Sequence, residues 1–306
     1  MTGLPPQQHI TVAVCTFRRA SLTATLKSIA AQTLELSQPL RVIVADNDVT
    51  DTRRVEIEDL GESLQLNLQY LHAPCRNISI ARNACLQNCQ TRFLAFIDDD
   101  EIAEPNWLED LVRKMGDSQF VFGPCEAVYP RDTPKWIRMA DMHSNRLSDG
   151  DADWNGYTSN VLIDVDFVGQ QKLRFSEMLG QSGGEDTYFF FQAKQLGAKF
   201  GYAGEAKVLE PVNPNRLSFS WAAKRRFRSG QVHYMILKSQ ANLVRGVIGA
   251  VFKAMFCFVS APAFGLRWRE PLLRGLLHAG VVAHAIGIPL YAEYASPVNL
   301  SPKSAV

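Results

Sequence analysis

Residues 93–101 read Phe-Leu-Ala-Phe-Ile-Asp-Asp-Asp-Glu, a short apolar run that ends in four consecutive acids. Such a run, rich in aromatic and β-branched residues, is typical of a buried strand. Similar runs lie upstream and alternate with amphipathic segments: the runs cover residues 10–14, 40–45 and 68–71, and the segments cover 21–32, 51–60 and 78–89. This alternation predicts an α/β fold with a parallel, doubly wound sheet flanked by helices.

Polar or acidic side chains follow three of these runs, at 15–19 (Cys-Thr-Phe-Arg-Arg), 46–48 (Asp-Asn-Asp) and 98–101. Ligands of such sheets bind beyond the carboxyl ends of the strands, so we expect these groups to form one site. Asp98 and Asp100 can turn toward one pocket while Asp99 points elsewhere. Their hard oxygen ligands suit Mn²⁺ or Mg²⁺ held together with substrate phosphates. A solvated acidic start to the helix near Pro105 is the alternative.

A second acidic element, Gly183-Gly184-Glu185-Asp186, opens a predicted helix over 185–196. The glycines let the backbone approach a ligand, and Asp186 would present a carboxylate at a pocket wall. Helix capping by Glu185 and Asp186 is the alternative. Strands are predicted over 157–164 and 199–203, and residues 130–156 are expected to be a long functional loop region.

The net charge of +1 hides two unlike parts of the chain. Residues 1–214 carry 20 basic and 29 acidic side chains, whereas residues 215–306 carry 12 basic and 2 acidic ones. The first residues lack a basic segment followed by a long apolar one, and the six cysteines form no CxxC pair. We therefore expect a cytoplasmic protein with reduced thiols. The charge difference suggests that residues 215–306 lie in different surroundings from residues 1–214.

The helix predicted over 219–238 contains Lys224, Arg225, Arg226 and Arg228. The acidic body argues against nucleic acid, so an anionic membrane surface or a lipid diphosphate is the expected partner, with a solvated helix face as the alternative. Apolar residues then cover 244–266, interrupted by charges, and 275–292, which has 18 uncharged residues. The second stretch is borderline for a span of about 20 residues, so we expect monotopic attachment, with a buried helix or a true span as alternatives.

Taken together and in order, these motifs resemble the family 2 glycosyltransferases of the GT-A fold. The matching pieces are Val-Ala-Val-Cys-Thr-Phe-Arg-Arg at 12–19, Ile-Ala-Arg-Asn at 80–83, Phe-Ile-Asp-Asp-Asp at 96–100 and Gly-Glu-Asp at 184–186. Residues 77–83, 183–187 and 223–231 resemble, more narrowly, the β-1,4-glucosyltransferases of succinoglycan exopolysaccharide assembly. The resemblance implies a GT-A catalytic domain over 1–214 and a basic amphipathic membrane-association region over 215–306.

The resemblance further implies an inverting transfer of one hexose, glucose from UDP-glucose, to a lipid-diphosphate-linked oligosaccharide at the cytoplasmic face of the bacterial inner membrane. The processive Gln-x-x-Arg-Trp motif does not follow, which favours transfer of a single sugar. The resemblance also assigns roles to single residues. On the nucleotide side, Thr16 and Arg18 would bind the nucleotide, Asp46 or Asn47 would contact uracil, Arg82 and Asn83 would approach uracil or ribose, and Asp98 and Asp99 would belong to the same site. Asp98 and Asp100 would hold Mn²⁺ or Mg²⁺, and Asp186 would be the general base, with Glu185 beside it.

Two other functions fit parts of the sequence. Residues 46–50 match the DxDxT pattern of haloacid-dehalogenase-like phosphatases, with Asp46 as nucleophile and 98–100 as Mg²⁺ ligands, but this leaves the Gly-Glu-Asp element unexplained. A non-enzymatic scaffold of a polysaccharide assembly complex would bind lipid-linked glycan without turnover. Side chains that could contact the acceptor, or be merely structural, are Trp136, His143, Trp154, Tyr157 and Asn160.

Overall fold

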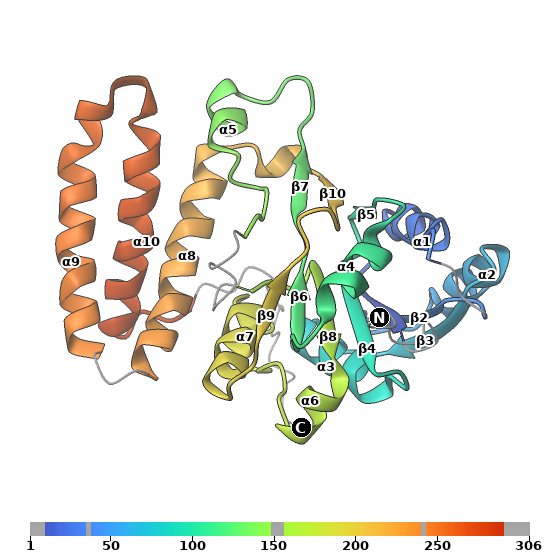
Figure 1. The fold of residues 1–306 in the computed structure, drawn as a ribbon. Coiled ribbons are helices and arrows are strands. Elements are labelled where there is room, and N and C mark those ends of the chain that lie inside the picture. Colours follow the sequence, from blue (N-terminus) through green and yellow to red (C-terminus); the bar gives the residue numbers. More distant parts are fainter. Residues whose placement is uncertain (1–9, 35–37, 148–155, 240–242, 291–306) are drawn as a thin grey trace, which may run out of the picture.

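The computed structural model describes residues 10–34, 38–147, 156–239 and 243–290. A seven-stranded sheet forms its centre, in the order β3-β2-β1-β4-β8-β6-β9 (Figure 1). The strands are β1 (Ile10–Thr16), β2 (Arg41–Asp46), β3 (Asn67–His72), β4 (Phe93–Asp98), β6 (Phe120–Phe122), β8 (Asn160–Asp164) and β9 (Phe200–Tyr202). The helices around it are α1 (Leu22–Ala30), α2 (Arg54–Ser63), α3 (Ile78–Asn88), α4 (Trp107–Met115), α5 (Lys135–Ala140), α6 (Val165–Gln170) and α7 (Glu185–Gln195).

The sheet is mostly parallel, and this confirms the expected fold class. β1 pairs in parallel with both β2 and β4, and β3 extends the row beyond β2. β8 runs antiparallel to β4 and β6, which agrees with the expectation of a mostly parallel sheet. Between β6 and β8 the described residues form β7 (Cys125–Val128), in a separate sheet, and α5 (Lys135–Ala140).

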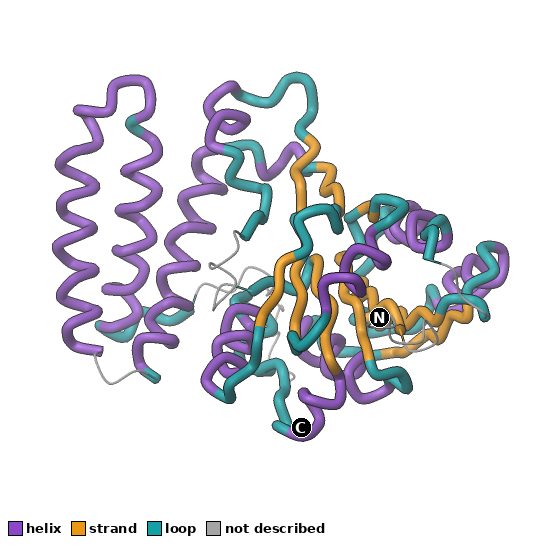
Figure 2. Tube along the Cα trace, viewed as in Figure 1, coloured by secondary structure: helices purple, strands orange, loops and turns teal. Residues whose placement is uncertain are grey.

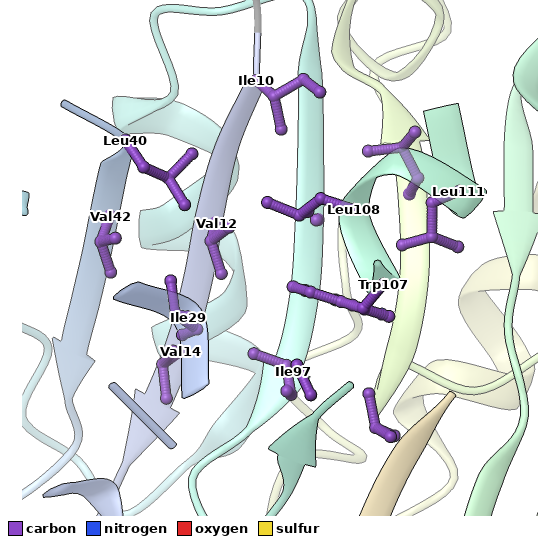
Figure 3. Packing of buried hydrophobic residues seen from close by; sticks show 14 of the residues in the cluster. Ile10, Val12, Val14, Ile29, Leu40, Val42, Ile97, Trp107, Leu108 and Leu111 are labelled. Atoms are coloured by element: carbon purple, nitrogen blue, oxygen red, sulfur yellow. The ribbon is translucent and has the colours of Figure 1, made fainter. Parts of the chain in front are cut away.

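Helices cover both faces of the sheet. On one face α1, α2 and α4 bury their apolar sides against the strands, and on the other α3, α6 and α7 do so. Figure 3 shows Trp107, Leu108 and Leu111 of α4 in the same cluster of buried residues as Ile97 of β4, and α4 also contacts β6, β8 and β9. Burial of apolar area on both faces explains why the strand sequences are near-continuous apolar runs. This core holds the strand ends in fixed positions.

A second, three-stranded sheet lies beside the carboxyl ends of the main strands. It has the order β5-β10-β7, from β5 (Ile102–Ala103), β10 (Val208–Pro211) and β7 (Cys125–Val128). These strands were not predicted, because two to four residues are too few for a clear alternation of apolar and polar side chains. The sheet brings β10, more than a hundred residues downstream, next to the acids that follow β4.

The basic C-terminal region is helical, as expected. It contains η1 (Pro214–Arg216), α8 (Phe219–Lys238), α9 (Leu243–Ser260), η2 (Ala261–Arg267) and α10 (Arg269–Ala285). α10 lies between α8 and α9, and α8 faces the sheet domain (Figures 1 and 2). A side chain at Gly230 would collide with the Leu277 carbonyl, and one at Gly280 with the Phe227 carbonyl. The paired glycines therefore let α8 and α10 pack backbone to backbone.

The two apolar stretches of this region have different surroundings. α10 buries Leu273, Gly275, Gly280 and Val281, so much of the stretch 275–292 packs inside the bundle, and residues 291 and 292 lie outside the described ranges. Among the described residues, Leu243–Gly265 is the one segment long and apolar enough to cross a membrane. The stretch to consider for lipid contact is therefore the first, not the second.

Candidate active site

A cavity of about 950 Å³ opens at the carboxyl ends of β1 and β4. β1 has β2 on one side and β4 on the other, so these two strand ends flank the point where the strand order reverses. Open α/β sheets bind ligands at this point, because the chain diverges there and leaves a crevice. The remaining walls come from the start of α7, from α8 and from α10.

Three carboxylates after β4 form an acidic wall of this cavity. Asp98 pairs in register with Cys15 of β1, which brings the ends of the two strands together. Thr16 donates a hydrogen bond to Asp99 (2.7 Å), and Arg19 forms ion pairs with Asp99 and Asp100. These bonds fix the turn that carries the acids.

Burial and the neighbouring acids raise the pKa of Asp98 to about 7, although the charge of Arg82 acts in the opposite direction. Burial likewise raises the pKa of Asp99 to about 6, against the attraction of Arg19. Carboxylates that lie close together ionise less readily than isolated ones, and a bound Mn²⁺ or Mg²⁺ favours their ionised form. Asp98 and Asp100 both line the cavity and fit such an ion.

A deeper group of Glu101, Cys125 and Glu210 lies beneath the acidic wall, with ligand atoms within 4.8 Å of one another. The Cys125 thiol donates to Glu101 (3.0 Å), whose other oxygen accepts from the Asp98 backbone N–H (3.0 Å). Burial and the charge of Asp98 raise the pKa of Glu101 well above its usual value. This group therefore supports the Asp98 turn, and because its thiol is a softer ligand than oxygen it suits a hard cation less well than the wall above it.

Arg82 of α3 joins the two acidic elements that the sequence singled out. Its guanidinium, nearly inaccessible to solvent, forms an ion pair with Glu185 and lies 3.8 Å from an Asp98 oxygen. Burial alone would lower the pKa of Arg82, but Glu185 and Asp98 raise it above its usual value. Arg82, expected near uracil or ribose, thus lies in the cavity wall between the strand end and α7.

The start of α7 presents two carboxylates in different environments. Gly183 and Gly184 have φ values of +80° and +92°, which side chains other than glycine adopt only with strain. Glu185 is buried, with one oxygen on Arg82 and the other, Oε2, without a hydrogen-bond partner. Asp186 is half-buried and accepts a hydrogen bond from Thr187 within its own turn (2.6 Å to the backbone N–H). Asp186 is therefore the carboxylate with the freer face toward the cavity.

The turn after β2 is largely occupied by bonds within the protein. Asp46, 1% exposed, accepts from the Tyr70 hydroxyl (2.9 Å) and the Asp48 N–H (3.0 Å). Asn47 lines the cavity and pairs with the Asn77 backbone. A nucleophile must reach its substrate, so the buried position of Asp46 contradicts the phosphatase alternative.

The cavity brings together eight of the eleven predicted site residues. Those lining it are Thr16, Asn47, Arg82, Asp98, Asp99, Asp100, Glu185 and Asp186. The other three, all in described segments, lie outside its lining: Asp46 as above, Arg18 in a bidentate pair with Asp48 (2.6 and 2.9 Å), and Asn83 in two bonds with the Phe175 backbone (2.9 Å each). Their positions support the turns beside the cavity.

Several lining residues were not singled out from the sequence. Arg76 lies over the Phe17 ring (5.4 Å) beside Asn47, and Arg216 bridges Glu210 (2.6 Å) and Asp100 (3.8 Å). Phe17 belongs to the quoted 15–19 stretch and could have been noted. Glu210 and Arg216 have no sequence signal, because the small second sheet alone brings them to the site.

The expected acceptor aromatics have mixed positions. His143 stacks on Trp221 of α8 (5.0 Å between centroids), and burial lowers its pKa to about 4. Tyr157 lines the cavity but donates its hydroxyl to the Gly123 carbonyl (2.7 Å), whereas Trp136 packs against Phe219. Asn160 is fully buried and accepts from the Trp107 indole (2.7 Å), so it is structural. Trp154 lies outside the described residues.

The mostly parallel sheet, with an acidic cavity at its switch point, is the architecture of the GT-A glycosyltransferases. Residues 11–172 match the model of the family "Glycosyl transferase family 2", which is more than half of the chain. The chain belongs to this family.

A relative and two solved structures agree with this assignment. The chain is 40% identical over 297 residues to the succinoglycan biosynthesis protein ExoM of Rhizobium meliloti (strain 1021), covering 94% of this chain and 96% of that protein. The mannosyltransferase PcManGT of Pyrobaculum calidifontis, solved with GDP-Man and Mn²⁺, has a TM-score of 0.62 at 17% identity over 90% of this chain and 87% of its own. S. aureus TarS 1–349 with UDP-GlcNAc has a TM-score of 0.54 at 14% identity, covering 92% of each chain. At such identities the structures establish the fold alone.

Proposed function

We propose that the protein transfers a single hexose, glucose from UDP-glucose, with inversion to a lipid-diphosphate-linked oligosaccharide in succinoglycan-type exopolysaccharide biosynthesis. The relative's name supports the pathway, and the UDP-GlcNAc and GDP-Man complexes of the structural neighbours support a nucleotide-sugar donor. The observation that carries the proposal is that Asp98, Asp100 and Asp186 line one cavity at the switch point of the sheet.

In this mechanism the acidic wall is the donor side. Asp98 and Asp100 would hold Mn²⁺ or Mg²⁺, and the bound ion would stabilise, as a Lewis acid, the charge of the departing diphosphate. Thr16 and Arg19 hold Asp99 in place, and Asn47 and Arg76 lie where the nucleotide base would enter. Arg82 keeps the Asp98 turn and the start of α7 together by binding a carboxylate of each.

Asp186 is the proposed general base. An acceptor hydroxyl is a weak nucleophile near neutral pH, so a carboxylate must take its proton during attack on the sugar carbon. Glu185 is a poorer candidate because the buried guanidinium of Arg82 already binds it. Attack from the α7 side, opposite the departing diphosphate, would give the inverted product.

The proposed location is the cytoplasmic face of the bacterial inner membrane. α9 has a buried side of Ala250, Ala254 and Cys257, which faces the bundle. Its opposite side exposes apolar residues at helical spacing, Val244, Ile248, Val251, Met255 and Val259, next to Phe252 and Phe256. Arg245 and Lys253 lie on this exposed helix as well. An apolar stripe with basic neighbours fits a helix that lies in the interface of an anionic bilayer.

A donor screen tests the proposal directly. Purified full-length protein is incubated with Mn²⁺ or Mg²⁺, each UDP-hexose in turn and a lipid-linked oligosaccharide, and the products are analysed by mass spectrometry. We expect the addition of one hexose from UDP-glucose. No transfer from any UDP-sugar would refute the proposed function and would favour a scaffold role.

A further inference from the structure

The wall of the cavity formed by α8 has a charge opposite to that of the strand ends. Along the cavity-lining face of this helix, an aromatic ring (Trp221) is followed by cationic residues (Arg225, Arg226, Arg228) and then by apolar ones (Val232, Ile236). At 1.5 Å per residue, the lining residues extend over about 22 Å of the helix axis. One helix thus presents three chemically different zones to a single cavity.

Two arginines of the cationic zone, Arg225 and Arg226, have no carboxylate within ion-pair distance among the described residues. Arg225 lies over the Trp221 ring (5.2 Å), which also stacks on His143, whose lowered pKa keeps it neutral near pH 7. Burial, Arg225 and Arg274 lower the pKa of Arg226, which shows that cations rather than acids surround it. Neighbouring like charges are unfavourable unless an anion lies between them.

The apolar zone lies next to the cationic one. Val232 and Ile236 are buried, and Leu277 of α10 joins them in the cavity lining. The adjacent Arg228 packs against Gly183, where a side chain would meet its guanidinium at 3.4 Å. A molecule that fits both zones has a compact negative group joined to a hydrocarbon chain.

The donor diphosphate is not the group that this wall requires. The acidic wall would hold the donor through a cation, whereas guanidinium groups bind phosphate directly and need no metal. The cavity volume lies near the upper end of the range for ligand pockets, which leaves room for a second ligand beside a nucleotide sugar.

We infer that Arg225 and Arg226 bind the diphosphate of the lipid-linked acceptor, with the beginning of its lipid chain against Val232, Ile236 and Leu277. The identity of the ligand as the acceptor rests on the proposed function, but the binding of an amphiphilic diphosphate does not. This site is distinct from the metal-dependent donor site. The donor diphosphate would bind the acidic wall through a cation, whereas the acceptor diphosphate would bind the arginines directly.

Direct binding tests the inference without requiring turnover. The full-length protein is titrated with farnesyl diphosphate, and separately with farnesol, in EDTA by isothermal calorimetry. We expect the diphosphate to bind without metal and more tightly than farnesol. The double variant Arg225→Gln/Arg226→Gln should lose about tenfold or more in affinity. The matched control is Lys224→Gln, which removes a cation from the same helix outside the cavity lining.

Retained binding of UDP with Mn²⁺ verifies that the double variant is folded, and the single variant Arg225→Gln replaces it if that binding is lost. Equal affinity in wild type and variant, or an equal loss in Lys224→Gln, would overturn the inference. A selective loss of UDP affinity in an otherwise folded Arg225→Gln protein would also overturn it, by assigning the arginines to the donor.

A kinetic comparison then links the site to the acceptor. With the lipid-diphosphate acceptor the double variant should raise the acceptor KM about tenfold. With the same oligosaccharide lacking diphosphate, variant and wild type should react alike. Equal defects with both acceptors would refute the assignment. If no transfer occurs in wild type while farnesyl diphosphate binding still depends on Arg225 and Arg226, the proposed function fails and the anion site stands.

Discussion

The two charged walls of the cavity are built in different ways. The acids after β4 are placed by strand pairing and are bonded to Thr16, Arg19 and Arg82, so their geometry is set before any ligand arrives. Arg225 and Arg226 belong to one helix outside the sheet, and no described carboxylate lies within ion-pair distance of them. The sheet therefore provides a reaction centre whose geometry is fixed before a ligand binds, whereas α8 provides positive charge that an anionic ligand can neutralise.

The largest effect is expected at Asp186, on the acidic side. Asp186→Asn removes the carboxylate of its turn that Arg82 does not bind, so transfer should fall by about 10³-fold or more, within the range of general-base catalysis. Product formation is measured by mass spectrometry, and UDP binding with Mn²⁺ serves as the control for folding. Substantial turnover in this variant would assign the base to another residue.

A smaller loss is expected at the metal ligands of the same wall. Asp98→Asn or Asp100→Asn removes a hard anionic ligand, and Mn²⁺-dependent binding of UDP should weaken by about tenfold or more. Calorimetric titrations with and without Mn²⁺ measure the effect. Asp117→Asn, at an exposed position outside the cavity, is the matched control. If Mn²⁺ strengthens UDP binding equally in all these proteins, the ion binds elsewhere.

The basic region can be tested through its outermost helix. Phe252→Gln/Phe256→Gln removes exposed apolar area from α9, so binding to anionic vesicles should fall by about tenfold. Vesicle flotation measures the bound fraction. Met178→Gln alters an exposed apolar residue of the sheet domain and should leave that fraction unchanged. Similar losses in both proteins would show that α9 is not the lipid-contacting surface.

The smallest expected effect is a pH dependence confined to the acidic wall. The pKa values of Asp98 (about 7) and Asp99 (about 6) exceed those of an unfolded chain, so the folded protein binds more protons between about pH 4 and 7. The contribution of the acidic wall to the stability of the metal-free protein should therefore fall as pH rises through this range, and the affinity for Mn²⁺ should increase. Histidines with a lowered pKa, such as His143, act in the opposite direction, so the contribution is measured as the difference between wild type and Asp98→Asn. Thermal unfolding at pH 5.5, 6.5 and 7.5, with and without Mn²⁺, measures both trends. A metal-free Tm that changes with pH equally in wild type and Asp98→Asn would contradict the raised pKa of Asp98.

The sequence predicted the part of the fold whose signals are local. Apolar runs, amphipathic segments and acids at strand ends were sufficient for β1 to β4, the helices between them and the cavity at 98–101. The direction of β8 and the short strands of the second sheet could not be predicted, because they depend on pairing across long stretches of chain. Arg82 and Glu185 are 103 positions apart, so their ion pair has no sequence signature.

Hydropathy likewise indicated the apolar stretches 244–266 and 275–292 of the basic region. It did not indicate which of them packs inside the helical bundle. α10 is enclosed because paired glycines bring it against α8, whereas α9 packs on one side only. Periodicity identifies an apolar face. Only tertiary packing decides whether protein or solvent lies against it.

The turn that presents Asp186 rests directly on α8. A side chain at Gly184 would collide with Val232, which belongs to the same helix as Arg225 and Arg226. The proposed base and the proposed anion site therefore share one support. If a ligand at Arg225 and Arg226 shifts α8, this contact is the route by which the shift would reach Asp186, and the rate of donor hydrolysis with and without farnesyl diphosphate would measure it.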